Sequence, residues 1–191
     1  MGDDPDIDAS RAVDRPYRIL FVCLGNICRS PTAEGVMRAL VRAAGLEDRI
    51  ELDSAGTGDW HIGEPPDARA STAARGRGIA LEGAARQVQR SDFREFDLIV
   101  AMDASNFANL RQAAPDEAAR AKILLLRELD PPADGRLDVP DPYHGGARGF
   151  EDVFDLVHAA CAALLARVRE TLPAVVAGAS AGETARDSLG A

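Results

Sequence analysis

Short apolar runs alternate with longer segments of helical periodicity along most of the chain. Four candidate strands lie at residues 17–23, 50–56, 97–102 and 122–129. The short apolar runs at 17–23 and 97–102 are typical of strands that are buried on both faces, whereas 50–56 ends in a turn of small residues. Helical periodicity or helix-capping residues mark the segments 30–45, 68–78, 91–96, 103–114 and 150–172. This alternation predicts a single α/β domain, a doubly wound four-stranded parallel sheet with helices on both faces.

Capping residues and loop residues set the expected boundaries of these elements. Ser30 is predicted to cap the first helix, with Pro31 in its first turn and Gly45 at its end. Asp103 is predicted to cap the helix at 103–114. Gly and Pro concentrate in two loops, at 57–67 and 130–149. The second loop is long enough that we expect it to carry function.

Both ends of the chain differ from its middle. Residues 1–16 are acidic and show no periodicity, and residues 173–191 are rich in small and polar side chains. Such composition predicts a disordered N-terminal arm at 1–16 and a disordered C-terminal tail at 173–191. The folded domain is then expected to span residues 17–172.

Composition and charge argue against several classes of protein. The 191 residues suit one domain, and the net charge of −9 argues against a general nucleic-acid binder. No apolar window is long enough to span a membrane, and the N-terminus lacks the apolar core of a signal peptide. We therefore expect a cytoplasmic protein with no membrane association, while export without such a signal stays open. Three cysteines are too few for a disulfide scaffold, and no metal cluster or cofactor motif is visible.

The most informative segment joins the first strand to the first helix. Cys23 ends the strand, at the edge of a parallel sheet where ligands bind, and Arg29 stands at the helix entry. Unpaired N–H groups at a helix N-terminus attract anions, and a guanidinium can grip two oxygens of a phosphate. Gly25 and Asn26 suit the unusual backbone of such a loop. The same surroundings are expected to lower the pKa of Cys23 and make it a phosphorus nucleophile.

A plainer interpretation treats Cys23 as a small buried hydrophobe and Arg29 as a surface charge. The ordered combination of strand, cysteine, Gly–Asn loop, arginine, serine and helix disfavours it. The loop is not a Walker loop, which needs Gly-Lys followed by Ser or Thr.

These motifs resemble a known family. "VCLGNICRSPTAE" is similar to the signature of the low-molecular-weight protein tyrosine phosphatases, and "DSAGTGDWHIGEPPD", "ARQV", "FDLIVAMDASN" and "DPYHGG" extend the resemblance over roughly residues 17–170. It implies hydrolysis of phosphotyrosine through a phosphocysteine, without a metal or cofactor. The implied partners are tyrosine-phosphorylated proteins or peptides, with phosphate and other oxyanions as inhibitors.

The resemblance also implies residue roles. Cys23 is the implied nucleophile and Arg29 the clamp for the phosphate oxygens. The implied phosphate-binding loop comprises Leu24, Gly25, Asn26, Ile27, Cys28 and Arg29. Ser30 is similar to the hydroxyl that donates to the thiolate, Ser54 to one that steadies Asn26, and Asp103 to the carboxylate that holds the arginine.

The general acid is expected in the loop at 130–149. By resemblance it is Asp141, set between two prolines, which protonates the leaving oxygen and later activates water. From the residues alone, Asp141 is equally compatible with an ordinary Asp-Pro turn, and Asp138 is a nearby competitor.

Aromatic residues in loops suggest the walls of a substrate slot. By resemblance Trp60 and Tyr143 flank an aryl ring, with His144 where familiar eukaryotic members have a second tyrosine. His61 is interpreted as a loop residue without a role. Gly83 stands where the family often has a histidine that bonds the loop asparagine, which predicts that part of this support is absent.

Other functions on the same loop have to be weighed. Arsenate reductases need two further cysteines, whereas here only Cys161 lies outside the loop, at a core position of the last helix. Protein arginine phosphatases carry threonine at the position of Ile27, so phosphotyrosine is favoured. A thiol redox sensor could use a reversible Cys23–Cys28 bond, and a pure phosphate-binding module would not need the cysteine. A pure sensor would leave Asp141 and Arg29 idle, so we expect redox chemistry to be regulatory.

Overall fold

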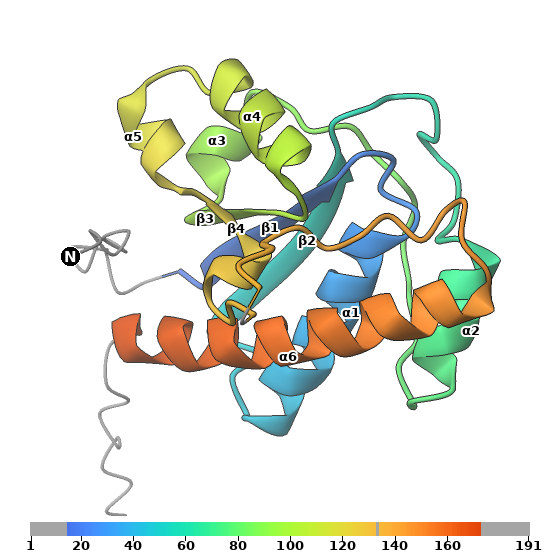
Figure 1. Ribbon diagram of the computed structural model, residues 1–191. Helices are drawn as coiled ribbons and strands as arrows, with labels where there is room; N and C mark the ends of the chain where they lie inside the picture. Colours follow the sequence, from blue (N-terminus) through green and yellow to red (C-terminus); the bar gives the residue numbers. More distant parts are fainter. Residues whose placement is uncertain (1–14, 133, 173–191) are drawn as a thin grey trace, which may run out of the picture.

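The structure is a computed structural model that describes residues 15–132 and 134–172 (Figure 1). The tail expected at 173–191 lies outside the described residues, as does the arm expected at 1–16 except for Arg15 and Pro16. Arg15 pairs with Asp97, with 2.7 Å between Nη2 and Oδ1. The described chain therefore begins with a contact to the segment that precedes the third strand.

The sheet has the predicted four parallel strands. β1 (Tyr17–Cys23), β2 (Ile50–Gly56), β3 (Leu98–Ala101) and β4 (Ile123–Leu125) lie in the order β2-β1-β3-β4. β1 is central, and its last residue, Cys23, lies beside Gly56 at the end of β2. The carboxyl ends of β1 and β2 thus meet at one edge of the sheet.

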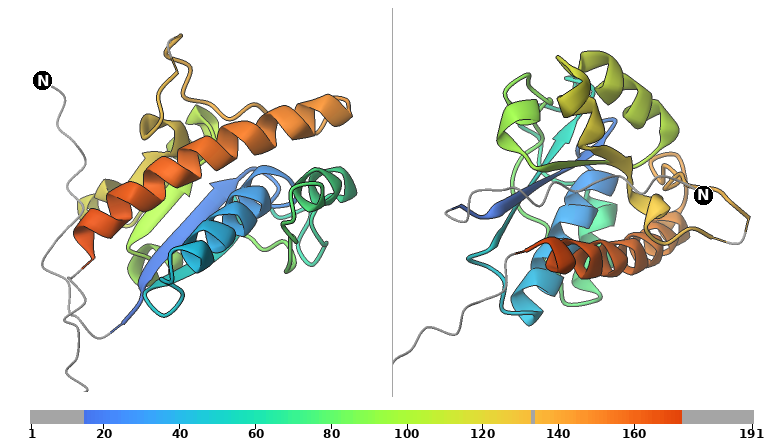
Figure 2. Two further views of the ribbon diagram at one scale, coloured as in Figure 1. Left: turned by 90° about the horizontal axis from the view of Figure 1, so that it is seen from below. Right: turned by 90° about the vertical axis from the view of Figure 1, so that its left-hand side faces the viewer.

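Helices cover both faces of this sheet, which confirms the doubly wound architecture (Figures 1 and 2). In the described residues the α-helices are α1 (Arg29–Ala43), α2 (Ala68–Arg75), α3 (Asp92–Glu95), α4 (Ala104–Ala113), α5 (Glu117–Ala121) and α6 (Ala147–Thr171). Helices α1 and α6 pack together on one face, and α3, α4 and α5 cover the other. Helix α2 lies against the end of α6.

The alternation of side chains along β1 explains why both faces need helices. Ile19 and Phe21 are fully buried in the cluster formed with α1 and α6, whereas Leu20 and Val22 are fully buried in the cluster formed with α3, α4 and α5. Packing on each face removes apolar side chains from water, and this burial stabilises the fold by about 25 cal/mol per Å² of apolar surface. A strand buried on both sides is a rigid base for a functional group at its end.

The structure differs from the expected elements in several places. The strand predicted at 122–129 has only three residues and continues as a 3-10 helix, Leu126–Glu128, because its neighbour β3 ends where Ala101 pairs with Leu125. Helix α5 was not expected, since five residues are too few to show a period. Helix α1 begins at Arg29, before Ser30, whose hydroxyl bonds side chains of the preceding loop instead of capping the helix.

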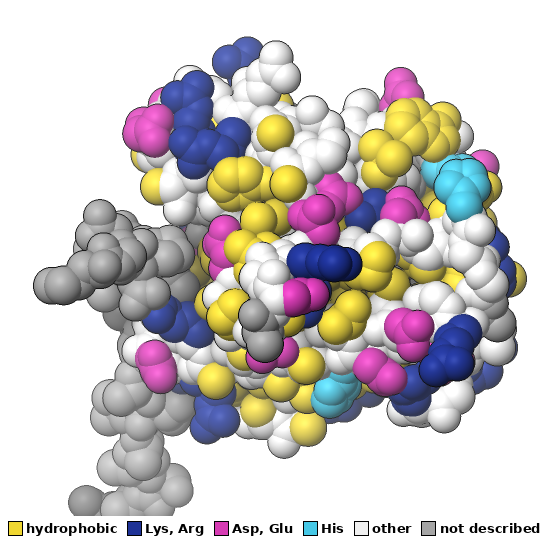
Figure 3. All heavy atoms as spheres, in the orientation of Figure 1, with side chains coloured by type: hydrophobic (Ala, Val, Ile, Leu, Met, Phe, Trp, Pro, Cys, Tyr) yellow, Lys and Arg dark blue, Asp and Glu magenta, His cyan; other side chains and the backbone are white. Residues whose placement is uncertain are grey.

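The surface of the described chain is mixed in charge. Figure 3 shows acidic and basic side chains interspersed over the face that it views. Of the helices that the structure describes, none is both long enough and apolar enough to cross a membrane.

Candidate active site

The loop between β1 and α1 forms a cup that is held by neighbouring backbone. The N–H groups of Thr57 and Gly58, just after β2, donate to the carbonyls of Cys23 and Leu24 at 2.9 Å each. The N–H of Asp67, at the start of α2, donates to the carbonyl of Ile27 at 2.7 Å. In the described part of the chain, no side-chain hydrogen bond caps α1. Its first N–H groups therefore remain available to an anion.

Asn26 and Gly25 make this cup possible for different reasons. Asn26 has φ of 56°, and among the described residues it is the only non-glycine with a positive φ. Gly25 is not in the left-handed region. Glycine fits here because a larger residue would be too close to His61: its Cβ would lie 2.9 Å from Cδ2 of His61. The expectation that both residues supply unusual backbone angles is thus right for Asn26 alone.

Buried hydroxyl and amide groups support Cys23 from behind. Its Sγ lies 3.0 Å from Oγ of Ser30 and accepts from the N–H of Asn26 at 3.2 Å. The Asn26 amide donates to Ser30 and to Ser54 at 2.9 Å each, and its Oδ1 accepts from the N–H of Arg86 at 2.9 Å. The support expected to be missing at Gly83 is therefore replaced by a backbone N–H, and every polar atom of this amide has a partner.

Arg29 is a buried cation between two carboxylates. Its side chain is 4% exposed; Nη1 lies 2.5 Å from Oδ2 of Asp103, and Nη2 lies 2.8 Å from Oδ2 of Asp141. Burial by itself lowers the pKa of Arg29, but electrostatic interactions with Cys23 and Asp141 and the hydrogen bond to Asp103 together raise it. Asp103 also caps α4 as expected, accepting from the N–H of Asn106 at 2.7 Å. The guanidinium is therefore fixed and permanently charged at the mouth of the cup.

The two candidate acids occupy different places. Asp141 faces Arg29, and its Oδ1 accepts from the N–H of Tyr143 at 3.0 Å. Asp138 accepts from the N–H of Ala104 at the start of α4, and it does not line the cavity over the cup. Asp141 therefore lines the cavity beside Arg29, and Asp138 does not.

A cavity of about 370 Å³ opens over the cup. Most of the residues expected for the cup and the substrate slot line it, namely Cys23, Leu24, Gly25, Ile27, Cys28, Arg29, Trp60, Asp141, Tyr143 and His144. The exposed rings of Trp60 and Tyr143 form its outer part, and the Tyr143 ring meets the His144 ring edge-on at 5.1 Å. Its floor is charged and its walls are aromatic, which suits an aryl phosphate.

Sequence reasoning gave no role to three residues at or near this site. His61 lines it, and its Nδ1 pairs with Oε2 of Glu64 at 2.7 Å. Arg69 donates to the carbonyl of Tyr143 at 3.0 Å and so reaches the loop of Asp141. Glu34 is 9% exposed and lies behind the cup. Only Glu34 left a usable signal, because it follows Ser30 by four residues and so shares its face of α1.

The other two cysteines differ from Cys23 in their surroundings. Burial, with smaller contributions from Asp67 and Cys23, raises the pKa of Cys28 to about 12. Cys161 is fully buried in the core, as expected, and burial raises its pKa too. Both are therefore thiols at neutral pH. Among the described residues, no group of three His, Cys, Asp or Glu side chains could hold a metal ion.

Comparison with known proteins places these features in a family. Residues 18–174 match the family described as "Low molecular weight phosphotyrosine protein phosphatase". A low molecular weight protein-tyrosine-phosphatase of Streptomyces coelicolor is 54% identical over 155 residues, which cover 81% of this chain and 94% of the relative.

Solved structures agree with this match. A protein tyrosine phosphatase from Entamoeba histolytica, with Hepes in its active site, superposes with a TM-score of 0.77 at 39% identity, covering 81% of this chain and 97% of that one. Wzb from Vibrio vulnificus, solved in complex with benzylphosphonate, gives a TM-score of 0.68 at 32% identity, covering 79% and 98%.

Proposed function

The chain belongs to the low molecular weight phosphotyrosine protein phosphatases, and we propose that it hydrolyses phosphotyrosine through a phosphocysteine formed on Cys23. The single observation that carries this proposal is the convergence of Cys23, Arg29 and Asp141 on one cavity. The three residues come from the end of β1, the start of α1 and the loop before α6. A pure phosphate-binding module would need only the first two of these segments.

The first step is attack by the Cys23 thiolate on phosphorus. The Sγ–P bond forms as the bond to the phenolic oxygen breaks, and Arg29 with the N–H groups of the cup stabilises the charge on the three equatorial oxygens. Asp141 gives its proton to the departing oxygen. In the second step Asp141 takes a proton from water, which attacks phosphorus and releases phosphate and the thiolate.

The contact between Arg29 and Asp141 links substrate binding to the first chemical step. A phosphate dianion that enters the cup accepts hydrogen bonds from Nη2 of Arg29, which now donates to Asp141. The carboxylate then loses its cation and faces a dianion, and both changes favour its protonated form. Substrate binding thereby prepares the acid that the first step consumes.

The walls of the cavity support an aryl substrate. Trp60 and Tyr143 present exposed rings at the mouth, and Ile27 gives the inner wall an apolar branched side chain. The benzylphosphonate bound by the Vibrio relative has the same combination of ring and phosphorus oxyanion. Tyrosine-phosphorylated proteins or peptides are the partners we propose, with phosphate and other oxyanions as inhibitors. A cytoplasmic location stays a prediction from the sequence.

Arsenate reduction and redox sensing receive less support. Cys161 is buried in the core with its Sγ 3.7 Å from the carbonyl of Ala33, so it is poorly placed for a thiol relay to the cup. Cys23 and Cys28 line the same cavity, and a reversible disulfide between them would regulate the enzyme. It would switch the phosphatase off by occupying its nucleophile.

The proposal is tested with Cys23→Ser. We expect this variant to lose turnover of an aryl phosphate while still binding vanadate or phosphate, because serine keeps the cup but is a far weaker nucleophile at neutral pH. Cys161→Ser serves as the matched control for removing a thiol and should keep its turnover. Turnover in Cys23→Ser together with its loss in Cys28→Ser would reverse the assignment of the nucleophile.

A further inference from the structure

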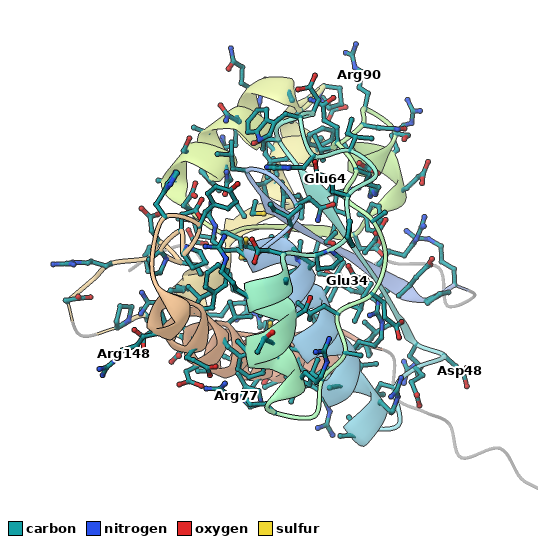
Figure 4. All side chains as sticks on the ribbon, turned by 90° about the vertical axis from the view of Figure 1, so that its right-hand side faces the viewer. Glu34, Asp48, Glu64, Arg77, Arg90 and Arg148 are labelled. Carbon is teal, nitrogen blue, oxygen red and sulfur yellow. The ribbon has the colours of Figure 1, made fainter. Side chains whose placement is uncertain are left out.

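The indole of Trp60 stands at the mouth of the cavity and is largely exposed. It belongs to the loop of residues 57–67 between β2 and α2, on which Figure 4 labels Glu64. Its side chain lines the cavity, yet the residue is 59% exposed. Exposed side chains ordinarily change rotamer within nanoseconds, and fixing one of them when a ligand binds costs conformational entropy. A ring at this place therefore helps a substrate most if a neighbouring residue already holds it.

Gly58 lies against the Trp60 ring. A Cβ at Gly58 would lie 2.4 Å from both Cη2 and Cζ3 of the indole and 2.9 Å from its Cε3. Among the described glycines, no other added Cβ would come as close to a neighbouring atom. The six-membered ring of the indole thus occupies the space that a side chain at position 58 would need. Trp60 lines the cavity and Gly58 does not, so the glycine contacts the ring and not the space for a substrate.

The backbone gives no other reason for a glycine at this position. Gly58 is not among the described glycines with a positive φ, so a residue with a side chain could adopt its conformation. Its N–H donates to the carbonyl of Leu24 at 2.9 Å, and the N–H of Thr57 donates to the carbonyl of Cys23 at 2.9 Å. These bonds fix the backbone under the ring to the cup. A Cβ added at position 58 would therefore displace the exposed ring and not the backbone.

We propose that Gly58 is a positioning residue for Trp60: because it lacks a side chain, the indole rests on backbone that is bonded to the cup, and the ring is preorganised for an aryl phosphate. The proposal rests on the proposed function, in which the ring of phosphotyrosine lies beside Trp60. A ring that is already in place attracts the substrate ring without the entropy cost of ordering a mobile side chain. Gly58 thus favours aryl over alkyl phosphates without touching the substrate.

The test compares two ligands that differ in their need for the ring. Isothermal titration calorimetry measures the Kd of benzylphosphonate and of inorganic phosphate for the full-length wild type and for Gly58→Ala. We expect Gly58→Ala to weaken benzylphosphonate by about 3- to 10-fold, the range for one lost ring–ring contact. Inorganic phosphate needs only the cup, so its Kd should stay within about twofold, as for a surface substitution.

Fluorescence reports on the ring directly, because Trp60 is the single tryptophan among the 191 residues. Time-resolved anisotropy should show a nanosecond rotation of the indole in Gly58→Ala that the wild type lacks. Gly76→Ala, at the end of α2, is the matched control, since its added Cβ would meet nothing closer than 3.5 Å. This control should match the wild type in both readouts. A freely rotating indole in the wild type overturns the proposal even if Gly58→Ala does not fold.

A double-mutant cycle shows whether Gly58 acts through the ring. Trp60→Ala should weaken benzylphosphonate, and Gly58→Ala should then add no further loss, because the contact that it disturbs is already gone. Additive losses, an equal loss for inorganic phosphate, or unchanged benzylphosphonate binding in Gly58→Ala would each overturn the proposal. A wild type that binds benzylphosphonate no more tightly than inorganic phosphate would contradict the aryl substrate and with it this proposal. These readouts need no turnover, so the other negative outcomes leave the test with Cys23→Ser unaffected.

Discussion

At the scale of single residues, Arg29 shows why its side chain cannot be exchanged for another cation. Its planar fork contacts Asp103 with one nitrogen and Asp141 with the other, in a site where it is almost fully buried. A lysine ammonium is a point charge that can satisfy one of these directions but cannot bond two phosphate oxygens in parallel.

Arg29→Lys should therefore lower kcat/KM for an aryl phosphate by about 10²-fold or more, as expected for losing a preorganised donor to developing charge. Steady-state kinetics measure this, with Arg42→Lys on the exposed face of α1 as the matched control. Near-normal activity in Arg29→Lys would mean that the N–H groups of the cup hold the phosphate without the fork.

Asp141→Asn separates leaving-group chemistry from binding. Asparagine keeps the shape and removes the transferable proton, so phosphotyrosine, whose phenol has a pKa of about 10, should lose far more rate than dinitrophenyl phosphate. The basic limb of the pH–rate profile, where Asp141 loses its proton, should flatten. Both substrates are assayed across pH, and Asp138→Asn is the control. Equal losses on both leaving groups would remove Asp141 from the role of acid.

The sequence was informative about residues whose chemistry is marked by spacing, and less so about those placed by the fold. Cys23 and Arg29 could be paired because six positions separate a strand end from a helix start. His61 could not be placed, because its position over Gly25 depends on how the loop after β2 folds back. Arg86 was also missed, since its contribution is a backbone N–H that no side-chain pattern reveals.

At the scale of elements, α2 supports the loop that carries Asp141. Arg69 on α2 donates to the carbonyl of Tyr143, and its guanidinium lies over the rings of Tyr143 at 5.3 Å and Phe150 at 4.6 Å. Asp67, which caps α2, bonds the carbonyl of Ile27 through its own N–H. One short helix thus connects the cup with the loop that stands over it.

Arg69→Met should loosen this connection while preserving much of the packing area. The hydrogen bond to Tyr143, the ion pair with Asp67 and one contact with each ring are lost, so we expect kcat/KM for phosphotyrosine to fall by roughly 3- to 10-fold. Arg75→Met, at the exposed end of the same helix, is the matched control. Full activity in Arg69→Met would show that Asp141 is positioned by its own loop and by Arg29 alone.

The bounds of an element could be predicted where its own residues set them, and not where a neighbouring element does. β1 and β2 were predicted at the residues where they occur; in β1 a nearly continuous apolar run reflects burial on both faces, and in β2 the small residues of its last turn mark its end. The extent of β4 could not be predicted, because it is limited by the length of β3 and not by its own sequence. Helix α6 begins three residues before its predicted start, in a Gly-rich segment where periodicity is weak.

At the scale of the whole molecule, the contacts described for the site lie within residues 15–172. A chain trimmed to this range should therefore keep kcat/KM within about twofold of the full-length protein, which steady-state kinetics will show. Trimming further to residues 15–165 removes Val168, a fully buried part of the core, and should lower the unfolding temperature by several degrees. A loss of activity on trimming to 15–172 would assign a contribution to the terminal segments.

The positions of the site segments along the chain also bear on when the enzyme becomes active during synthesis. The cup lies between β1 and α1, near the start of the chain, whereas Asp141 lies just before α6, the last helix. Helix α6 covers the face on which α1 packs, so the first β-α-β unit gains its full core only after α6 has been synthesised. A nascent chain on the ribosome would therefore hold the proposed nucleophile, Cys23, long before the proposed acid, Asp141, and we expect turnover to begin only once α6 has packed.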